Sequence, residues 1–313
     1  MMKRLVGLCV SFGIVAVLWW RVDVRAIAAA ARDADPVWLA SGLAMVVPLT
    51  LVTAWRFGRL ADGAVGVGTA IRLVLSASTL NLVMPSKMGD IAKSWVLIRR
   101  HGFSTRHALA LVGVEKVLDF ASLLVWGAGA LFWVGIDQPW VLLAALAVVG
   151  LLGMLLLLIL PVAAARRLLV RISGLLPGRV GHAVAAFLDS WEATVSRFWA
   201  RPGRALGILG VSVALWGAHL AQFWLFARAL DVGVPFVDNM AFATLAILAG
   251  LLPLTIAGVG TRDAAIVVFY APWLAPSQGA VLGMLATMRY VIPAVAGLPF
   301  LRDYWPGKIE RDI

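Results

Sequence analysis

The feature that most constrains this chain is an apolar run of 26 residues, Trp140–Ala165, that contains no charged side chain. A bilayer core about 30 Å thick is crossed by a helix of about 20 apolar residues, so this run can span a membrane. The composition agrees, because 62% of the residues are hydrophobic and 14% are charged, against roughly 45–50% and about 25% in soluble domains. A soluble globular enzyme and a disordered chain are excluded. The sequence predicts a polytopic membrane protein.

The net charge of +11 arises from 27 Lys and Arg against 16 Asp and Glu. A basic balance can indicate nucleic-acid binding, but cytoplasmic loops of membrane proteins also collect Lys and Arg. We therefore expect no nucleic-acid partner. Cys9 is the one cysteine and lies in an apolar run, which excludes a disulfide framework and a thiolate metal site. The four His are far apart in the sequence, so we expect no metal and no cofactor.

Five further segments have the length and apolar character of spans: Leu5–Trp20, Pro36–Trp55, Arg106–Ile136, Ala205–Ala227 and Ser277–Leu301. The first also resembles a signal peptide, but its length and the arginines that follow it favour an uncleaved span. Together with Trp140–Ala165 they give about six full spans. We expect an all-α fold with a single transmembrane domain over residues 1–313.

Two apolar segments break before they could complete an ordinary span. Val67–Pro85 runs into Ser-Lys-Met-Gly-Asp, and Met240–Val259 runs into Gly-Thr-Arg-Asp. At membrane depth, broken backbone is tolerated only where protein or a water-filled cavity surrounds it. We therefore predict two re-entrant helical hairpins, at about 67–100 and about 240–275. Their expected hinge residues are Pro85, Gly89, Pro253, Gly258 and Gly260.

The distribution of basic residues predicts how these elements are oriented. Lys and Arg are clustered in five segments, which are Met1–Arg4, Arg56–Arg59, Lys87–Arg106, Arg166–Arg204 and Arg302–Arg311. If these are cytoplasmic, both termini are cytoplasmic, the first hairpin opens to the cytoplasm and the second opens to the outside. Hairpins of opposite orientation, one in each half, are typical of an inverted repeat. Arg21–Asp35 opposes this assignment, because it places three Arg outside.

The predicted cytoplasmic loop at 166–204 carries apolar residues at helical spacing from Val180 to Phe198, flanked by arginines. This pattern is typical of an amphipathic helix in an anionic lipid interface. A helix packed on its own protein would show the same pattern, and the two interpretations are equally favoured.

Charged residues within spans and hairpins are the candidates for function, because each costs about 2.5–3.5 kcal/mol at a helix centre and normally faces a cavity or a partner. Glu115 and Asp119 share a helix face and could be counter-ions, a proton relay or an acid–base pair. The glycines before Arg262 fit an anion-binding turn, and an ion pair of Arg262 with an acid fits equally. The candidate substrate-binding residues are Arg72, Asn81, Lys87, Asp90, Glu115, Lys116, Asp119, Arg262, Asp263 and Arg289.

Three motifs occur in a distinctive order: Asn81-Leu-Val-Met-Pro85-x-x-x-Gly89-Asp90, Glu115-Lys-Val-Leu-Asp119 and Leu252-Pro-Leu-Thr-Ile-Ala-Gly258-Val-Gly-Thr-Arg262-Asp263. With them the chain resembles the flippase-type lysylphosphatidylglycerol synthase transmembrane family, from Leu5 to Leu301. This family includes the membrane half of the bacterial multiple peptide resistance factor, which is taken to move aminoacylated phosphatidylglycerol between leaflets. It also includes stand-alone members tied to hopanoid or polyprenyl-linked glycan pathways.

The resemblance implies, with two departures, that eleven residues match family motif positions: Asn81, Pro85, Gly89, Asp90, Glu115, Lys116, Asp119, Gly258, Gly260, Arg262 and Asp263. Lys116 stands where the family more often has Arg, and Asp263 stands where it more often has Glu. Lys cannot form a bidentate clamp on phosphate, so the headgroup geometry would differ. Because residues 302–313 alone follow the last predicted span, we expect this chain to lack the aminoacyl-transferase activity of the fused relatives. Nothing resembling a nucleophile–base set accompanies Glu115 and Asp119, so we expect no enzyme activity.

These observations lead to an expected function with two alternatives. The leading hypothesis is a flippase of the bacterial cytoplasmic (inner) membrane, acting alone or as a homo-oligomer on an anionic phospholipid or a polyprenyl- or hopanoid-type lipid. One alternative is a secondary transporter of a small anion or polar metabolite, with Asp90, Glu115 or Asp119 carrying protons. The other is an accessory subunit that presents lipid to a membrane glycosyl- or acyltransferase.

Overall fold

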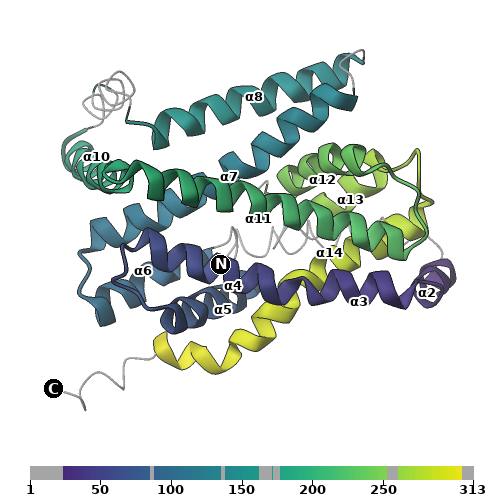
Figure 1. The fold of residues 1–313 in the computed structure, drawn as a ribbon, viewed down its shortest axis with the longest axis horizontal. Helices are drawn as coiled ribbons and strands as arrows, with labels where there is room; N and C mark the ends of the chain where they lie inside the picture. The colour runs from purple at the N-terminus through teal and green to yellow at the C-terminus, as the bar shows by residue number, and fades with distance from the viewer. Residues whose placement is uncertain are drawn as a thin grey trace.

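The computed structural model describes residues 24–84, 88–134, 138–161, 171, 177–251 and 260–304. These residues form α-helices, a short 3-10 helix and the turns between them (Figure 1). The predicted first span, Leu5–Trp20, lies outside the described residues, as do Pro85, Lys87, Pro253 and Gly258.

Four helical segments within the described ranges are long and apolar enough to cross a membrane, and each coincides with a predicted span. They are α3 with α4 (Pro36–Ala44 and Val46–Leu60), α8 (Pro139–Ile159), α11 (Pro202–Ala229) and α14 (Pro276–Gly297) with the 3-10 helix η3 (Leu298–Tyr304). Each begins with proline, which is favoured at this position because the first N–H of a helix has no partner within the helix. The chain is therefore a polytopic membrane protein.

Helix α7, Thr105–Val134, runs through the middle of the bundle (Figure 1). Its 30 residues correspond to about 45 Å at 1.5 Å per residue. It contacts α8, α12, α10, α11 and α6, so most of its surface faces protein. This contact explains how a helix can carry Glu115, Lys116 and Asp119 in its first half.

Two helix–break–helix pairs lie toward opposite ends of the bundle in Figure 1. The first consists of α5 (Val67–Val83) and α6 (Met88–His101), and the second of α12 (Phe236–Leu251) and α13 (Thr261–Phe269). The two helices of each pair pack against each other, and α14 contacts both α5 and α13. The residues between the two helices of each pair include 85–87 and 252–259, which lie outside the described residues and contain Pro85, Pro253 and Gly258. A short helix, α2 (Val24–Arg32), also packs against α14.

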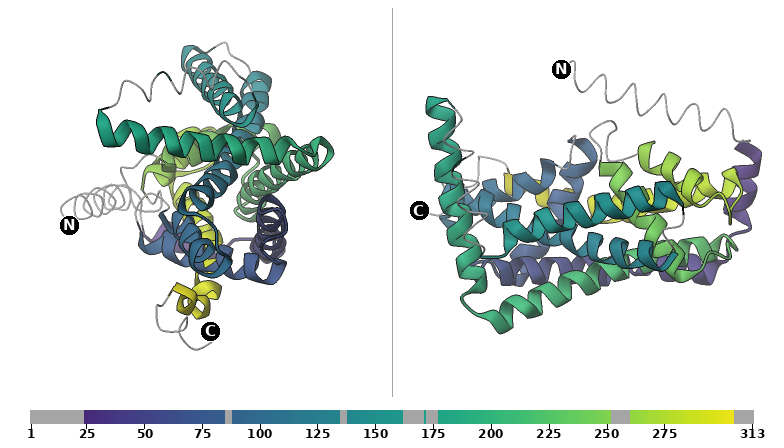
Figure 2. Two further views of the ribbon diagram at one scale, coloured as in Figure 1. Left: turned by 90° about the vertical axis from the view of Figure 1, so that its left-hand side faces the viewer. Right: turned by 90° about the horizontal axis from the view of Figure 1, so that it is seen from above.

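Helix α10, Gly178–Trp199, crosses one end of the bundle at a steep angle to the long helices (Figure 2). The indole Nε1 of Trp191 donates a hydrogen bond of 3.0 Å to the Leu158 carbonyl oxygen. Val195 and Phe198 are buried against the rest of the protein. Packing on the protein therefore accounts for the apolar stripe in the second half of this helix, whereas Val180 in the first half is exposed.

Candidate functional site

A pocket of about 200 Å³ lies among α4, α5, α6, α7, α11 and α14. One part of its wall is apolar and includes Val46, Leu49, Val74, Leu82 and Phe120. The rest is polar and includes the charged side chains of Asp90, Lys93, Glu115, Lys116, Asp119 and Arg289. We call it the central pocket.

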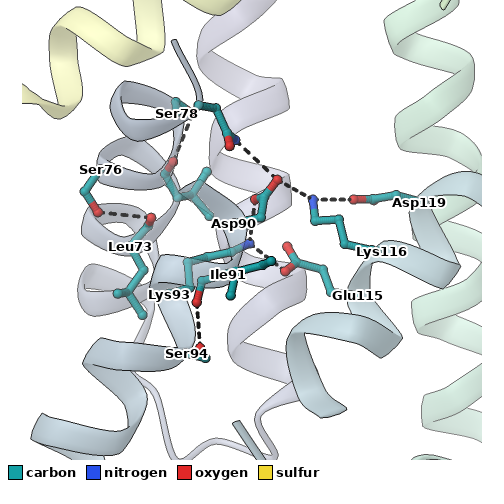
Figure 3. A network of polar contacts seen from close by, with 12 residues as sticks. Leu73, Ser76, Ser78, Asp90, Ile91, Lys93, Ser94, Glu115, Lys116 and Asp119 are labelled. Atoms are coloured by element: carbon teal, nitrogen blue, oxygen red, sulfur yellow. Dashed lines mark hydrogen bonds and ion pairs between the residues drawn. The ribbon is translucent and has the colours of Figure 1, made fainter. Parts of the chain in front are cut away.

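Six charged side chains on three helices form a continuous series of alternating sign, in the order Arg56, Asp119, Lys116, Asp90, Lys93 and Glu115. Figure 3 shows five of them, with the basic and acidic groups pointing toward one another. Arg56 comes from α4, two members come from α6 and three from α7. Three bases balance three acids, so this network contributes no net charge to the pocket.

Asp90 is the centre of the network. Its two carboxylate oxygens lie 3.2 Å from Nζ of Lys93 and 3.2 Å from Nζ of Lys116. The side-chain amide of Asn81, on α5, donates a third contact of 3.2 Å. Asp90 also lies in the first turn of α6, where the helix dipole favours a negative charge. The carboxylate therefore joins α5, α6 and α7.

The two ends of the network are buried. Nζ of Lys93 donates to Glu115 Oε2 at 2.6 Å and lies 4.8 Å from the centre of the Phe57 ring. At the other end, Arg56 pairs with Asp119 and donates to Ser212 Oγ at 2.9 Å, which adds α11 to the network. Removing one member of a buried ion pair is strongly destabilising, because it leaves a buried charge without compensation. These contacts therefore fix the relative positions of α4, α6, α7 and α11.

Arg289 lines the central pocket but does not belong to the network of three bases and three acids. It is 5% exposed, and within the described part of the chain it forms no ion pair with a carboxylate. Its guanidinium donates to the Tyr290 hydroxyl at 2.8 Å and to the His219 carbonyl oxygen at 3.4 Å. It lies 4.9 Å from the Phe223 ring centre, and its Nε has no hydrogen-bond partner among the described atoms. The pocket thus has one buried positive charge in excess.

The structure brings six of the predicted substrate-binding residues together around the central pocket: Asn81, Asp90, Glu115, Lys116, Asp119 and Arg289. Arg72 lies outside it, is exposed, and places its guanidinium 5.9 Å from the Phe300 ring centre. Arg262 and Asp263 also lie outside it, and Lys87 is not among the described residues.

Arg262 is buried and saturated by contacts with α13 and α14. Its guanidinium donates to the Gly283 carbonyl oxygen at 3.1 Å, to Thr287 Oγ1 at 2.6 Å and to Asp263 Oδ1 at 2.8 Å. The ion pair considered from the sequence is therefore present, and it joins α13 to α14. It leaves Arg262 few donors for an anion.

The two described hinge residues differ in conformation. Gly260 has φ = 101°, a region that favours glycine, and its N–H donates to Asp263 Oδ2 at 3.0 Å. Gly89 instead lies inside the first turn of α6. A Cβ there would lie 2.6 Å from the Asn81 backbone nitrogen, so this glycine permits close packing of α5 and α6.

Sequence reasoning missed Arg56 and Lys93, because both belong to basic clusters that were assigned to cytoplasmic loops. A local signal existed for Lys93, which follows Asp90 by three residues and therefore shares its helix face. Arg56 follows an apolar run directly, and nothing in the local sequence distinguishes it from a residue that anchors the end of a span.

No group of metal-ligating side chains is found in the described portion of the protein, and no curated protein matches the chain. The family model for the lysylphosphatidylglycerol synthase TM region matches residues 4–297. The match includes every residue of the charged network and Arg289. The chain therefore belongs to the lysylphosphatidylglycerol synthase transmembrane-region family.

Proposed function

We propose that this protein is a lipid translocase in which the anionic headgroup of a membrane lipid binds at Arg289 in the central pocket. The observation that carries the proposal is the buried, uncompensated charge of Arg289. An ionised group in a weakly polar environment is costly unless it is paired. A phosphate group is a suitable counter-ion, because the planar guanidinium can bind two phosphate oxygens at once.

Lys116 is the network residue best placed to share the headgroup. Its side chain is 30% exposed, whereas the side chain of Lys93 is 2% exposed. Asp119, which pairs with Lys116, is also held by Arg56. Lys116 could therefore turn toward a bound phosphate while Asp119 keeps one partner. Arg289 and Lys116 would give the headgroup two successive positive contacts.

The apolar wall of the central pocket favours a lipid over a free anion. Its volume of about 200 Å³ exceeds the ~150 Å³ of an apolar cavity that holds benzene, which is enough for a phosphate-bearing headgroup but not for acyl chains. The chains would remain in the bilayer while the headgroup moves. Membership of a family named for a lipid synthase supports the same assignment. The proposal includes no covalent step.

For the transmembrane arrangement we propose about six spans and two re-entrant hairpins, with both termini in the cytoplasm of a bacterium and the inner membrane as the location. The support for the hairpins is the placement of the α5–α6 and α12–α13 pairs toward opposite ends of the bundle (Figure 1), and the support for the cytoplasmic termini is the Lys and Arg near both ends of the sequence. Paired broken helices of opposite orientation are found at the substrate sites of transporters with inverted repeats.

The test is a flippase assay on protein reconstituted into vesicles that contain a labelled anionic phospholipid. We expect Arg289→Gln to slow lipid movement at least tenfold and Arg289→Lys to slow it less, because Lys keeps the charge but loses the bidentate geometry. Arg228→Gln is the matched control, because Arg228 lies near the end of α11, against Trp38 and Trp224, and does not line the pocket. Its rate should stay within twofold of the unaltered protein.

Equal rates for Arg289→Gln and the unaltered protein, with every anionic lipid tried, would contradict the proposal. Uptake of phosphate or another small anion without lipid movement would instead support a secondary transporter. Transport only in the presence of a co-purifying glycosyl- or acyltransferase would support an accessory role.

A further inference from the structure

A second pocket lies at the end of the bundle that α10 crosses, and we call it the end pocket. Its volume is about 310 Å³. It is formed by the turn after α4, the start of α7, the last turns of α10 and the first turn of α11. None of the residues that line it also lines the central pocket. The end pocket is therefore a separate site, and its argument does not depend on the proposed lipid translocation.

The polar side chains of the end pocket are predominantly basic. Arg197 and Arg204 line it together with His107, while Asp62 is the one carboxylate found in its described lining. Asp62 is engaged by Arg204, through an ion pair and a hydrogen bond. Arg197 remains as a positive charge without a carboxylate partner in the pocket, and Nε of Arg204 has no hydrogen-bond partner in the described structure.

Arg197 and Thr194 hold the His107 ring between them. Nη1 of Arg197 lies 3.4 Å from Nε2 of His107, and Oγ1 of Thr194 lies 3.3 Å from Nδ1. The ring also stacks on Phe103, with the two ring centres 5.1 Å apart. Oγ1 of Thr194 also donates to the Ser190 carbonyl oxygen at 2.8 Å, so it accepts from Nδ1–H of His107, and Nε2 of the neutral ring accepts from Arg197. His107 therefore orients the Arg197 guanidinium, whose remaining N–H groups can contact an anion.

Two helix N-termini add to this positive environment. His107 lies in the first turn of α7 and Arg204 in the first turn of α11, and these helices contain 30 and 28 residues. The N–H of His107 is bonded to Ser104 Oγ and the N–H of Arg204 to the Arg201 carbonyl oxygen, so what these helix ends contribute is the partial positive charge of the helix dipole, which favours an anion. The side-chain charges and the helix ends therefore indicate the same class of ligand.

We propose that the end pocket is a binding site for a phosphate group, supplied either by the headgroup of an anionic phospholipid or as free phosphate. The occupant contacts four separate parts of the fold, because the turn after α4, α7, α10 and α11 all contribute to the wall. It therefore holds α10 against the end of the bundle. A ligand that binds only the folded protein raises its stability with concentration, which makes the site measurable without a transport assay.

The experiment measures the thermal unfolding midpoint of the full-length protein, stripped of lipid in a neutral detergent. It is titrated separately with inorganic phosphate, with short-chain phosphatidylglycerol and with short-chain phosphatidylcholine as a zwitterionic reference. We expect Arg197→Gln to weaken binding of the stabilising ligand at least tenfold, and Arg197→Lys to weaken it less. Arg201→Gln is the matched control, because Arg201 is an exposed arginine beside the pocket that does not line it, and its affinity should change less than twofold.

The titrations distinguish the two sources of phosphate. Stabilisation by inorganic phosphate supports a site for free phosphate, whereas stabilisation by phosphatidylglycerol alone supports a lipid headgroup. Three results would overturn the proposal: no stabilisation by any of the anionic probes, equal losses in Arg197→Gln and Arg201→Gln, or a response that Arg289→Gln removes and Arg197→Gln retains. The last result would assign the binding to the central pocket.

Discussion

The two helix–break–helix pairs start from similar sequence patterns and use their charges differently. In each, an apolar helix is followed in the sequence by proline and glycine, and a second helix carries an acid in its first turn, Asp90 in α6 and Asp263 in α13. Asp90 lies in the wall of the central pocket and contacts two lysines on two helices. Asp263 instead contacts the adjacent Arg262 and the N–H of Gly260.

This difference follows from what surrounds each acid. The charges of α6 meet the charges of α7, so their contacts form a network that faces a cavity. The base of α13 meets backbone carbonyl oxygens of α14, so its donors are used within the protein. A base and an acid after a broken helix therefore do not indicate a substrate site by themselves. The neighbouring helix decides whether they face a ligand or join two helices.

Removal of Lys93 should have the largest effect on stability. Lys93→Met leaves Glu115 buried without a base and takes one of two lysines from Asp90, so we expect a loss of about 3–5 kcal/mol. The measurement is the free energy of unfolding in detergent. The double variant Lys93→Met with Glu115→Gln removes the unpaired charge and should recover part of this loss. A double variant less stable than Lys93→Met would show that the pair is not coupled as described.

Removal of Arg262 should reduce the free energy of unfolding less than removal of Lys93, because Asp263 keeps other stabilising contacts. Asp263 would still accept the hydrogen bond from Gly260, and it lies in the first turn of α13, where the helix dipole favours its charge. We expect Arg262→Met to reduce the free energy of unfolding by about 1.5–3 kcal/mol, the range for hydrogen bonds of charged groups.

The rate at which the Arg262→Met variant moves lipid tests whether the second helix pair takes part in transport. Its rate in vesicles should stay within twofold of the unaltered protein at a temperature where both are folded, because Arg262 does not line the central pocket. A tenfold loss of rate with unchanged stability would place Arg262 in the transport site and remove the distinction between the pairs.

Four of the six predicted spans are long apolar helices in the described part of the chain, and the sequence predicted them because the physical cause of each lies within the segment itself. Trp140–Ala165 has no charge, and its helix, Pro139–Ile159, follows from that composition alone. The network was only partly predictable. The spacing of Lys93 from Asp90 is a local signal, whereas Arg56 becomes a site residue because α4 approaches α7, which no local pattern reveals. Arg262 is the opposite case: the sequence predicts a substrate-binding residue, but its side chain is held by carbonyl oxygens of α14. These partners lie more than 20 residues away in the chain, so no local pattern indicates them.

Glycine substitutions test how closely each pair is packed. A Cβ on Gly89 would collide with the backbone of α5, at Ala77 and Asn81, so Gly89→Ala should cost about 1–3 kcal/mol, the usual range for overpacking. At Gly279, where α14 meets the α13 region, a Cβ would meet the ends of the Val267 and Leu274 side chains, at 2.9 and 3.0 Å. Those side chains can move, so Gly279→Ala should cost less than Gly89→Ala.

The free energy of unfolding in detergent measures both substitutions. Gly150→Ala, in the middle of α8, is the control, because nothing lies within 4 Å of its added Cβ and Ala is favoured over Gly inside a helix. It should be neutral or slightly stabilising. A Gly279→Ala variant as unstable as Gly89→Ala would indicate that the second pair is packed against α14 as rigidly as α6 is against α5.

The smallest expected effect concerns Asp62, in the turn that leads into the first pair. The hydrogen bond from Arg204 holds the pKa of Asp62 below its ordinary value. A carboxyl whose pKa is lower in the folded state stabilises the fold above its unfolded pKa of about 3.9, and this contribution is lost as the pH falls through the folded-state pKa. Because Asp62 is well exposed, we expect about 0.2–1 kcal/mol, reduced by salt.

Asp62→Asn is the suitable variant, because Asp62 has φ = 55° and Asn tolerates this left-handed conformation well. The difference in unfolding free energy between the variant and the unaltered protein should be present at pH 7 and disappear at a pH below the folded-state pKa of Asp62. Raising the salt concentration at pH 7 should reduce it as well. A difference that persists unchanged at acidic pH would show that the turn is held by its backbone conformation, and that the ion pair with Arg204 adds nothing to the attachment of the first pair to α11.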